Sequence, residues 1–157
     1  MNIRLIKNAD MTKVATVYAE SFNEVEEERV WDKESAKLYM MHWFKKQPDL
    51  FLVAEHGNEI AGVVVGEIAP GPNGKMLTEV ELCVSNKFRK QGIAKSLLSK
   101  IILDSQEKYQ IVEVSFLAKS SAQYPIGWYK KIGMKDSPWV FMSGDSRIVL
   151  NNLKNDS

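Results

Sequence analysis

Several stretches of the chain alternate between apolar and polar residues, which is the pattern of half-buried β-strands. The predicted strands, in chain order, are residues 3–6, 51–55, 60–68, 76–84, 111–118, 139–142 and 147–150. The second and third flank a short polar turn at 56–59, so we expect them to form a hairpin. The last two flank Gly144 and Asp145 and are predicted to form another.

Other stretches repeat their apolar residues every three or four positions, as an amphipathic helix does. The predicted helices are residues 11–22, 33–46, 91–107 and 121–132. Asp10 or Thr12 can cap the first helix, and Gly133 should follow the last as its C′ residue. Leu38 and Met41 are expected on the buried side of the second helix, with Phe44 as a further candidate.

The order of elements is therefore β-α-α-β-β-β-α-β-α-β-β, which predicts an α/β (α+β) fold with helices packed on a mixed sheet. A chain of 157 residues suits one compact domain. Hydrophobic residues make up 45% of the chain and charged residues 26%, which is ordinary for a globular protein. We therefore expect a single domain over residues 1–157.

Charge and composition narrow the possible partners and the location. The formal net charge is +1, which argues against general nucleic-acid binding and against binding to a membrane surface. One cysteine and no apolar leader favour a cytoplasmic location, and no apolar run approaches the ~20 residues that span a bilayer. Two isolated histidines do not predict a metal site.

The most informative local feature is the passage from the strand at 76–84 into the helix at 91–107. Gly92 stands in this turn among four basic residues, Lys87, Arg89, Lys90 and Lys95, and no acidic residue occurs between positions 82 and 102. Free N–H groups and the positive end of a helix favour an anion there, best a phosphate or pyrophosphate. The glycine spacing fits neither a Walker loop nor a dinucleotide fingerprint.

Residues 89–94, Arg-Lys-Gln-Gly-Ile-Ala, resemble the Arg/Gln-x-x-Gly-x-Gly/Ala signature of the GNAT N-acetyltransferase superfamily. The flanking residues 82–84 and 95–98 fit the same pattern. Residues 128–134, Trp-Tyr-Lys-Lys-Ile-Gly-Met, resemble the family's Tyr-x-x-x-Gly-Phe segment. The resemblance implies a mixed, mostly antiparallel central sheet of about six to seven strands flanked by about four helices.

The resemblance also implies acetyl transfer from acetyl-CoA to a primary amine by direct attack in a ternary complex. Leu82, Cys83 and Val84 would pair with the pantetheine arm, and a backbone N–H near Val84 would polarise the thioester carbonyl. The implied pyrophosphate-binding residues are Arg89, Lys90, Gln91, Gly92, Ile93, Ala94 and Lys95. Ala122 stands where the family often has an asparagine that contacts the arm, so Ser121 or Ser120 would have to make that contact instead, and Tyr129 completes the cofactor site.

Two carboxylates are candidate general bases. Glu79 and Glu81 lie two apart on one strand, so both should face the side that carries Cys83, and each should raise the pKa of the other. Glu79 is favoured because it stands four residues before Cys83, where histone-type members of the family carry their catalytic glutamate. A water chain, or two merely solvated side chains on a sheet, are the alternatives.

Tyr129 is the candidate general acid, because a phenol can protonate a leaving thiolate and later recover its proton. Tyr124 is the alternative, and a tyrosine that only packs on a helix face is the simpler interpretation. Cys83 suggests a nucleophile, but with no histidine nearby in sequence a buried strand cysteine is favoured.

The acceptor should bind near the first two helices. That region holds Glu20, Glu24, Glu26, Glu27 and Glu28 together with Trp31, Tyr39 and Trp43. Acidic and aromatic side chains attract a cationic amine, so a small cationic molecule or a peptide or protein amine would fit, although a glutamate run is often just a solvated face. A homodimer is compatible with the family.

Two other functions remain open at this point. A catalytically silent acyl-CoA-binding regulatory module would bind the same cofactor and turn over no acceptor. A nucleotide-binding domain would use the same turn for a different phosphate.

Overall fold

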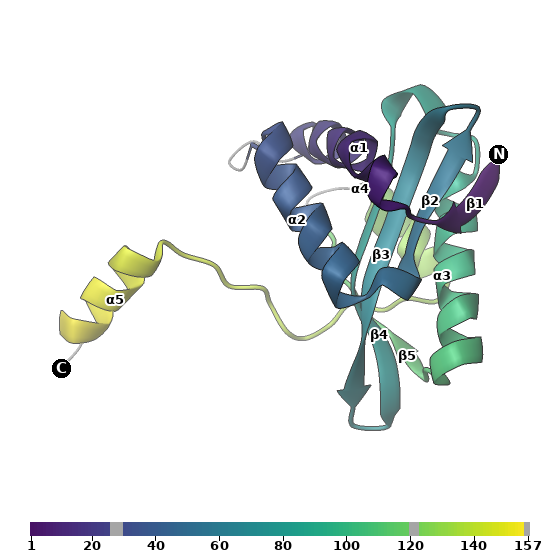
Figure 1. Ribbon diagram of the computed structural model, residues 1–157. Helices are drawn as coiled ribbons and strands as arrows, with labels where there is room; N and C mark the ends of the chain where they lie inside the picture. The colour runs from purple at the N-terminus through teal and green to yellow at the C-terminus, as the bar shows by residue number, and fades with distance from the viewer. Residues whose placement is uncertain (26–29, 120–122, 156–157) are drawn as a thin grey trace. The chain divides into compact units, whose positions relative to one another are not determined.

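The computed structural model describes residues 1–25, 30–119 and 123–155 and divides into two compact units (Figure 1). The first unit, Met1–Leu117, holds the whole described sheet, and the second, Ala118–Ser157, holds two helices. Among the residues whose burial the structure describes, every buried one lies in the first unit. The hydrophobic core therefore belongs to the sheet and the helices that cover it.

A five-stranded sheet forms the centre of the first unit. Its strands are β1 (Asn2–Leu5), β2 (Phe51–His56), β3 (Glu59–Gly71), β4 (Gly74–Val84) and β5 (Glu113–Val114). They lie side by side in chain order, with antiparallel pairing from β1 to β4 and parallel pairing between β4 and β5. The mixed, mostly antiparallel sheet and the hairpin at 56–59 are thus confirmed.

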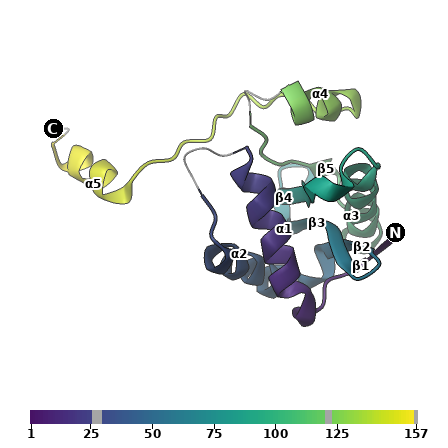
Figure 2. The same cartoon turned by 90° about the horizontal axis from the view of Figure 1, so that it is seen from above.

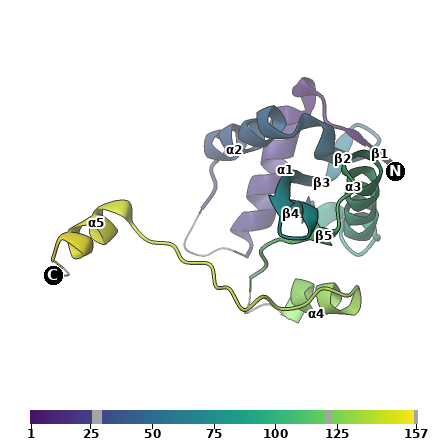
Figure 3. The same ribbon diagram turned by 90° about the horizontal axis from the view of Figure 1, so that it is seen from below.

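Helices cover both faces of this sheet, as Figures 2 and 3 show from opposite directions. The helices are α1 (Met11–Asn23) and α2 (Lys33–Lys46) on one face and α3 (Ile93–Tyr109) on the other. Short 3-10 helices, η1 (Asn8–Asp10), η2 (Pro48–Leu50) and η3 (Asn86–Phe88), lie in the connections. At Gly62 of β3 a Cβ atom would stand 3.0 Å from Leu97 Cδ1, so the missing side chain lets α3 approach the sheet closely.

The buried side of α2 differs from the prediction. Ala36, Met40 and Trp43 are the buried residues of this helix, whereas Leu38 is 71% exposed. The three buried positions follow a helical spacing, and a residue two positions from Met40 points to the opposite side. Met41, predicted together with Leu38, is half-buried against the same core.

The second unit contains α4 (Gln123–Lys131) and α5 (Ser146–Asn155). Gly133 follows α4 with φ +99°, and it is the predicted C′ residue. Gly133 N donates to Lys130 O at 3.1 Å and Met134 N donates to Tyr129 O at 3.0 Å. These two bonds form a Schellman motif, which ends the helix.

The predicted final hairpin is wrong, and the sheet has five strands among the described residues rather than six or seven. Residues 147–150 lie in α5, so the described part of the chain contains five α-helices. Asp145, expected in a hairpin turn, instead caps this helix by accepting from Arg147 N at 2.8 Å. Leu150 and Leu153 follow with the spacing of a helix. The strand expected at 111–118 is shortened to β5.

Candidate active site

A β-bulge interrupts β4 in its middle. Val65 of β3 pairs with Glu81 and Glu67 pairs with Thr78, so two residues of β4, Glu79 and Val80, face one residue of β3. Glu79 has φ +51°, a left-handed conformation that is uncommon for a residue with a side chain. The extra residue breaks the alternation of side chains along β4. Glu79 and Glu81 therefore do not share an environment as predicted, since Glu79 is exposed and Glu81 is half-buried.

The bulge also marks the point where β4 loses its partner on one edge. β5 pairs with Met76 and Leu77 only, which precede the bulge. Residues 81–84 remain paired with β3 on their other edge. Within the described part of the chain no strand covers the second edge of this segment, which includes Leu82, Cys83 and Val84. Such an edge offers backbone N–H and C=O groups to an extended ligand.

The turn after β4 brings an uncapped helix end to this edge. Lys90 and Gly92 adopt left-handed conformations, with φ +62° and +78°, on either side of Gln91. Gly92 is the N-cap of α3, and no side chain accepts a hydrogen bond from the first turn of the helix, which begins with Ile93 and Ala94. This backbone geometry presents N–H groups and the positive end of the helix dipole to an anion.

Acidic residues distant in sequence reach the basic side chains of this turn. Arg89 forms an ion pair with Glu24 at 2.7 Å, and its Nε donates to Val84 O at 3.2 Å. Lys87 forms an ion pair with Glu59 at 2.5 Å. Two of the four basic side chains around the turn are therefore already paired with acidic residues that are distant in sequence. Among residues 1–25, 30–119 and 123–155, Lys90 and Lys95 make no ion pair.

The Glu81 carboxylate lies between two phenol groups. Tyr39 Oη donates to one carboxylate oxygen at 2.7 Å, and Tyr18 Oη donates to the other at 3.4 Å. Burial raises the pKa of Glu81, the two phenol hydrogen bonds oppose this, and the charge of Glu79 adds to the rise. A raised pKa suits a carboxylate that accepts a proton near neutral pH. Glu81 therefore has the environment expected of a general base, although the sequence favoured Glu79 for that role.

Both phenols remain protonated donors. Burial, followed by the negative charge of Glu81, raises the pKa of Tyr18 and of Tyr39 well above the usual value. From the sequence alone Tyr18 had no predicted role, and Tyr39 was named only among possible acceptor-binding aromatics. The bond from each hydroxyl to Glu81 joins residues 63 and 42 positions apart, so no local pattern could indicate it.

Cys83 is a buried strand cysteine. Its side chain belongs to the core cluster under α1 and α2, and the residue is 7% exposed. Burial raises the pKa of the Cys83 thiol to about 12, so the thiol is protonated at neutral pH. This supports the structural interpretation of Cys83 over a nucleophile.

Aromatic residues of the predicted acceptor region cluster around Tyr18. Its ring centroid lies 4.3 Å from that of Phe22, 5.3 Å from Trp31 and 5.5 Å from Tyr39. Trp43 is 3% exposed and packs in the core, so it cannot stack on a ligand from solvent. Glu20 and Glu24 are exposed, while the predicted Glu26, Glu27 and Glu28 lie outside the described residues.

The remaining predicted residues belong to the second unit. Tyr129 is half-buried in α4, with its ring centroid 5.1 Å from that of Trp128. Tyr124, the alternative acid, lies on the same helix. Ser121 and Ser120 lie outside the described residues.

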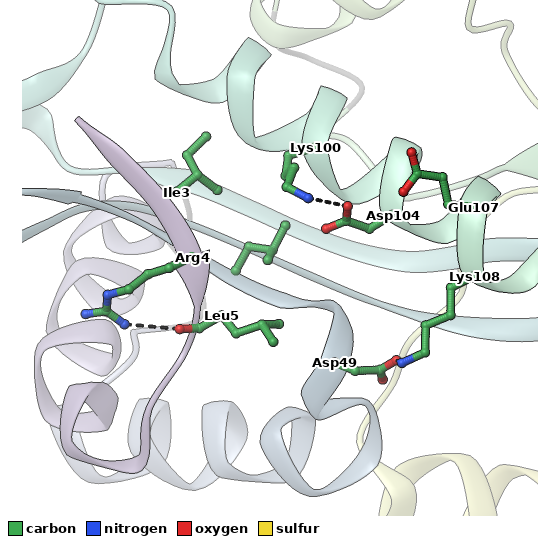
Figure 4. Close-up of a pocket in the computed structure, with 9 residues that line it drawn as sticks. Ile3, Arg4, Leu5, Asp49, Lys100, Asp104, Glu107 and Lys108 are labelled. Atoms are coloured by element: carbon green, nitrogen blue, oxygen red, sulfur yellow. Dashed lines mark hydrogen bonds and ion pairs between the residues drawn. The ribbon is translucent and has the colours of Figure 1, made fainter.

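A shallow hollow of about 480 Å³ lies elsewhere on the first unit, between β1, η2 and the C-terminal half of α3 (Figure 4). Its basic residues are already paired: Lys100 with Asp104, Lys108 with Asp49, and Arg4 with Asp10 and Glu55. The free edge of β4 and the start of α3 do not line it. We therefore assign it no part in the candidate site.

Two further features are absent from the part of the chain that the structure describes. It contains no cluster of three or more histidine, cysteine or acidic residues that could hold a metal ion. None of its helices is long and apolar enough to cross a membrane.

Comparison with protein families identifies the class to which this fold and turn belong. Residues 47–135 match the family model described as an acetyltransferase (GNAT) domain, which is more than half of the chain. The chain therefore belongs to the GNAT acetyltransferase family. The matched region includes β4, the turn and α3.

Individual relatives agree with this assignment. An acetyltransferase of Sodalis glossinidius is 29% identical over 148 residues, which are 92% of this chain and 94% of that protein. N-acetyltransferase family 8 member 2 of Rattus norvegicus is 30% identical over 101 residues, and these cover 63% of this chain and 44% of the rat protein. A structure of a predicted acetyltransferase with acetyl-CoA, from Clostridium acetobutylicum, has a TM-score of 0.70 at 18% identity and covers 90% of this chain and 95% of that chain. At that identity the structure shows a shared fold.

Proposed function

We propose that the protein is an N-acetyltransferase that moves an acetyl group from acetyl-CoA to a primary amine. The observation that carries this proposal is the free edge of β4 beyond the bulge, which leads directly into the uncapped start of α3. A strand edge and a helix N-terminus in series suit a ligand that is extended at one end and carries phosphates at the other. The structure of the Clostridium acetobutylicum relative with acetyl-CoA supports this choice of donor.

The residues present fit such a donor. The edge at Leu82, Cys83 and Val84 would hold the pantetheine arm, and the backbone from Gln91 to Lys95 would hold the pyrophosphate. Arg89 would have to exchange Glu24 for a phosphate, whereas Lys90 is available without such an exchange. When bound, the donor supplies an acetyl group activated as a thioester.

The acceptor amine must lose a proton, and Glu81 is the group we assign to take it. Glu81 is half-buried, its carboxylate has a raised pKa, and two phenols orient it. Glu79, which the sequence favoured, is exposed at the bulge and serves better as a nearby negative charge. We retain Tyr129 as the proposed general acid, supported by its place in the segment that resembles the family.

We also propose that residues 1–157 act as one domain. The family model spans residues 47–135 and thus crosses the boundary between the two units at 117 and 118.

Titration calorimetry followed by kinetics tests the proposal. Acetyl-CoA should bind, coenzyme A should compete with it and ATP should not; absence of acetyl-CoA binding would overturn the proposal. The Tyr129→Phe variant should then lose about 10²–10⁴-fold in transfer rate at unchanged acetyl-CoA affinity, as expected for a general acid. Binding with no turnover of any acceptor would instead support a silent acyl-CoA-binding module.

A further inference from the structure

The hydroxyl groups of Tyr18 and Tyr39 have a role that ring packing does not explain. Both rings belong to the aromatic cluster between α1 and α2, where phenylalanine would bury nearly the same area without a polar atom. Each hydroxyl instead donates to a different oxygen of Glu81, at 3.4 Å from Tyr18 and 2.7 Å from Tyr39. Each of the two helices thus supplies one hydroxyl donor, and each donor bonds to a different oxygen of the carboxylate.

This arrangement fixes the carboxylate at several points. β4 fixes the backbone of Glu81, and the two hydroxyls fix the plane of its oxygens. A carboxylate has about four lone-pair sites, so each oxygen keeps one for another donor. Glu81 is therefore oriented before an acceptor arrives, which is the condition for efficient proton transfer.

We propose that Tyr39 is a positioning residue for acetyl transfer, with Tyr18 in support: their hydroxyls hold Glu81 in the orientation in which it takes a proton from the acceptor ammonium. This inference rests on the proposed function. In the step, an N–H bond of the ammonium breaks, its electron pair stays on nitrogen, and the proton forms an O–H bond with Glu81. The neutral amine is then the nucleophile.

Several titratable groups surround Glu81, and they decide the effect of pH. Tyr18 faces it from α1 and Tyr39 from α2, while Glu79 and Cys83 flank it on β4. The phenols and the thiol are neutral near pH 7, so Glu79 is the charged neighbour. On β3, Glu67 is neutralised by an ion pair with Lys46 of α2.

Removal of one hydroxyl should change when Glu81 is available as a base. Tyr39→Phe deletes a hydrogen bond that favours the carboxylate and leaves the burial that opposes it. The pKa of Glu81 should therefore rise, and the acid limb of the rate profile should move to higher pH. Tyr18→Phe should produce a smaller shift in the same direction, because its bond is longer.

The first test compares profiles of kcat/KM against pH for the wild-type chain, Tyr39→Phe and Tyr18→Phe. At the acid end Tyr39→Phe should lose at least about tenfold in rate, and on the alkaline plateau less than about twofold. Tyr109→Phe is the matched control, because its hydroxyl donates to Asp49, far along α3 from the start of the helix, and its profile should match that of the wild type. A loss by Tyr39→Phe that is equal at every pH overturns the positioning role.

The second test does not depend on activity. Carboxyl carbon-13 NMR of glutamate-labelled protein, with the Glu81 signal assigned by Glu81→Gln, should show its titration midpoint at higher pH in Tyr39→Phe. An unchanged midpoint overturns the proposal, as does a midpoint that moves while the rate profile does not. If the wild-type chain transfers no acetyl group, the proposed function fails, and the NMR midpoint still decides whether Tyr39 holds the carboxylate. Should Tyr39→Phe lose its native circular dichroism, Tyr18→Phe serves in both tests.

Discussion

At the scale of single residues, the backbone of Glu79 is the least expected feature of β4. A strand that alternates as regularly as residues 76–84 predicts extended backbone throughout, yet Glu79 has φ +51°. No property of a glutamate side chain indicates this conformation, because it follows from the pairing with β3 across the bulge. The sequence therefore indicated two carboxylates on this strand and could not indicate which one would be buried.

The left-handed backbone of Glu79 should reverse the usual order of stability of a glycine and an alanine variant. In an extended strand glycine is less stable than alanine by about 0.5–1 kcal/mol, but in a left-handed conformation only alanine is strained. Glu79→Gly should therefore be more stable than Glu79→Ala by about 1 kcal/mol, measured by urea unfolding. Lys75 lies in the same strand as Glu79 and pairs regularly with Pro70 of β3, so there the alanine variant should be more stable than the glycine variant. Alanine as the more stable residue at position 79 would contradict the bulge.

The raised pKa of Glu81 predicts how the free energy of unfolding changes with pH. Because its pKa is raised in the folded chain, the unfolded chain loses this proton first as the pH rises. The charge then destabilises the fold above the folded pKa, and the penalty vanishes below the unfolded pKa of about 4.3. Glu81→Gln should thus gain stability over the wild type at pH 7 and lose that gain near pH 4. A constant difference between the two chains from pH 4 to 7 would show that Glu81 titrates normally.

At the scale of elements, the start of α3 carries the proposed pyrophosphate site. Gly92 has φ +78°, and a Cβ atom there would meet no heavy atom within 4 Å. Gly92→Ala therefore introduces backbone strain of about 1 kcal/mol without a clash, and it places a methyl group beside the N–H groups of the helix. Acetyl-CoA affinity, measured by calorimetry, should fall at least about tenfold, which is about 1.4 kcal/mol.

Gly57 offers the matched control for this substitution. It has φ +59° in the turn between β2 and β3, and a Cβ atom there also meets nothing within 4 Å. Gly57→Ala should cost similar stability and leave acetyl-CoA affinity unchanged. Equal loss of affinity in both variants would trace the effect to folding rather than to the helix start.

Element type was predictable where several local signals agreed. The spacing of apolar residues correctly predicted the bounds of α2, and Gly133 correctly predicted the end of α4. The prediction of a final hairpin was wrong because Asp145 is equally suited to a turn and to a helix N-cap. The three apolar residues at 148–150 are too short a run to distinguish a strand from a helix. The buried side of α2 was wrong because Leu38 is apolar but lies outside the helical repeat of Ala36 and Met40.

At the scale of the whole molecule, contacts between distant segments decide how the site is built. Arg89 contacts Glu24, and Glu81 contacts Tyr18 and Tyr39, and each pair is separated by 42 or more positions in the sequence. The sequence predicted the elements that carry these residues and the resemblance named the family, but pairing between side chains depends on the packing of α1 and α2 on the sheet. For that reason the acidic partners of Lys87 and Arg89, which are Glu59 and Glu24, could not be predicted.

Ligand binding should stabilise the folded chain, and the size of this effect should distinguish acetyl-CoA from ATP. At a concentration of about 100 times its Kd, acetyl-CoA should add about 2.7 kcal/mol to the free energy of unfolding. For a chain of this length that corresponds to a rise of about 5–10 °C in Tm by differential scanning calorimetry. ATP at the same concentration should leave Tm unchanged. A rise with ATP and none with acetyl-CoA would favour a nucleotide-binding domain.

The most direct test is release of free thiol from acetyl-CoA by the wild-type chain, measured against a panel of small cationic amines and peptide amines. We expect release that depends on both acetyl-CoA and at least one amine, that saturates with that amine, and that falls at acid pH as Glu81 becomes protonated. Release that is the same with and without every amine, from protein shown to bind acetyl-CoA, would contradict the proposed transfer.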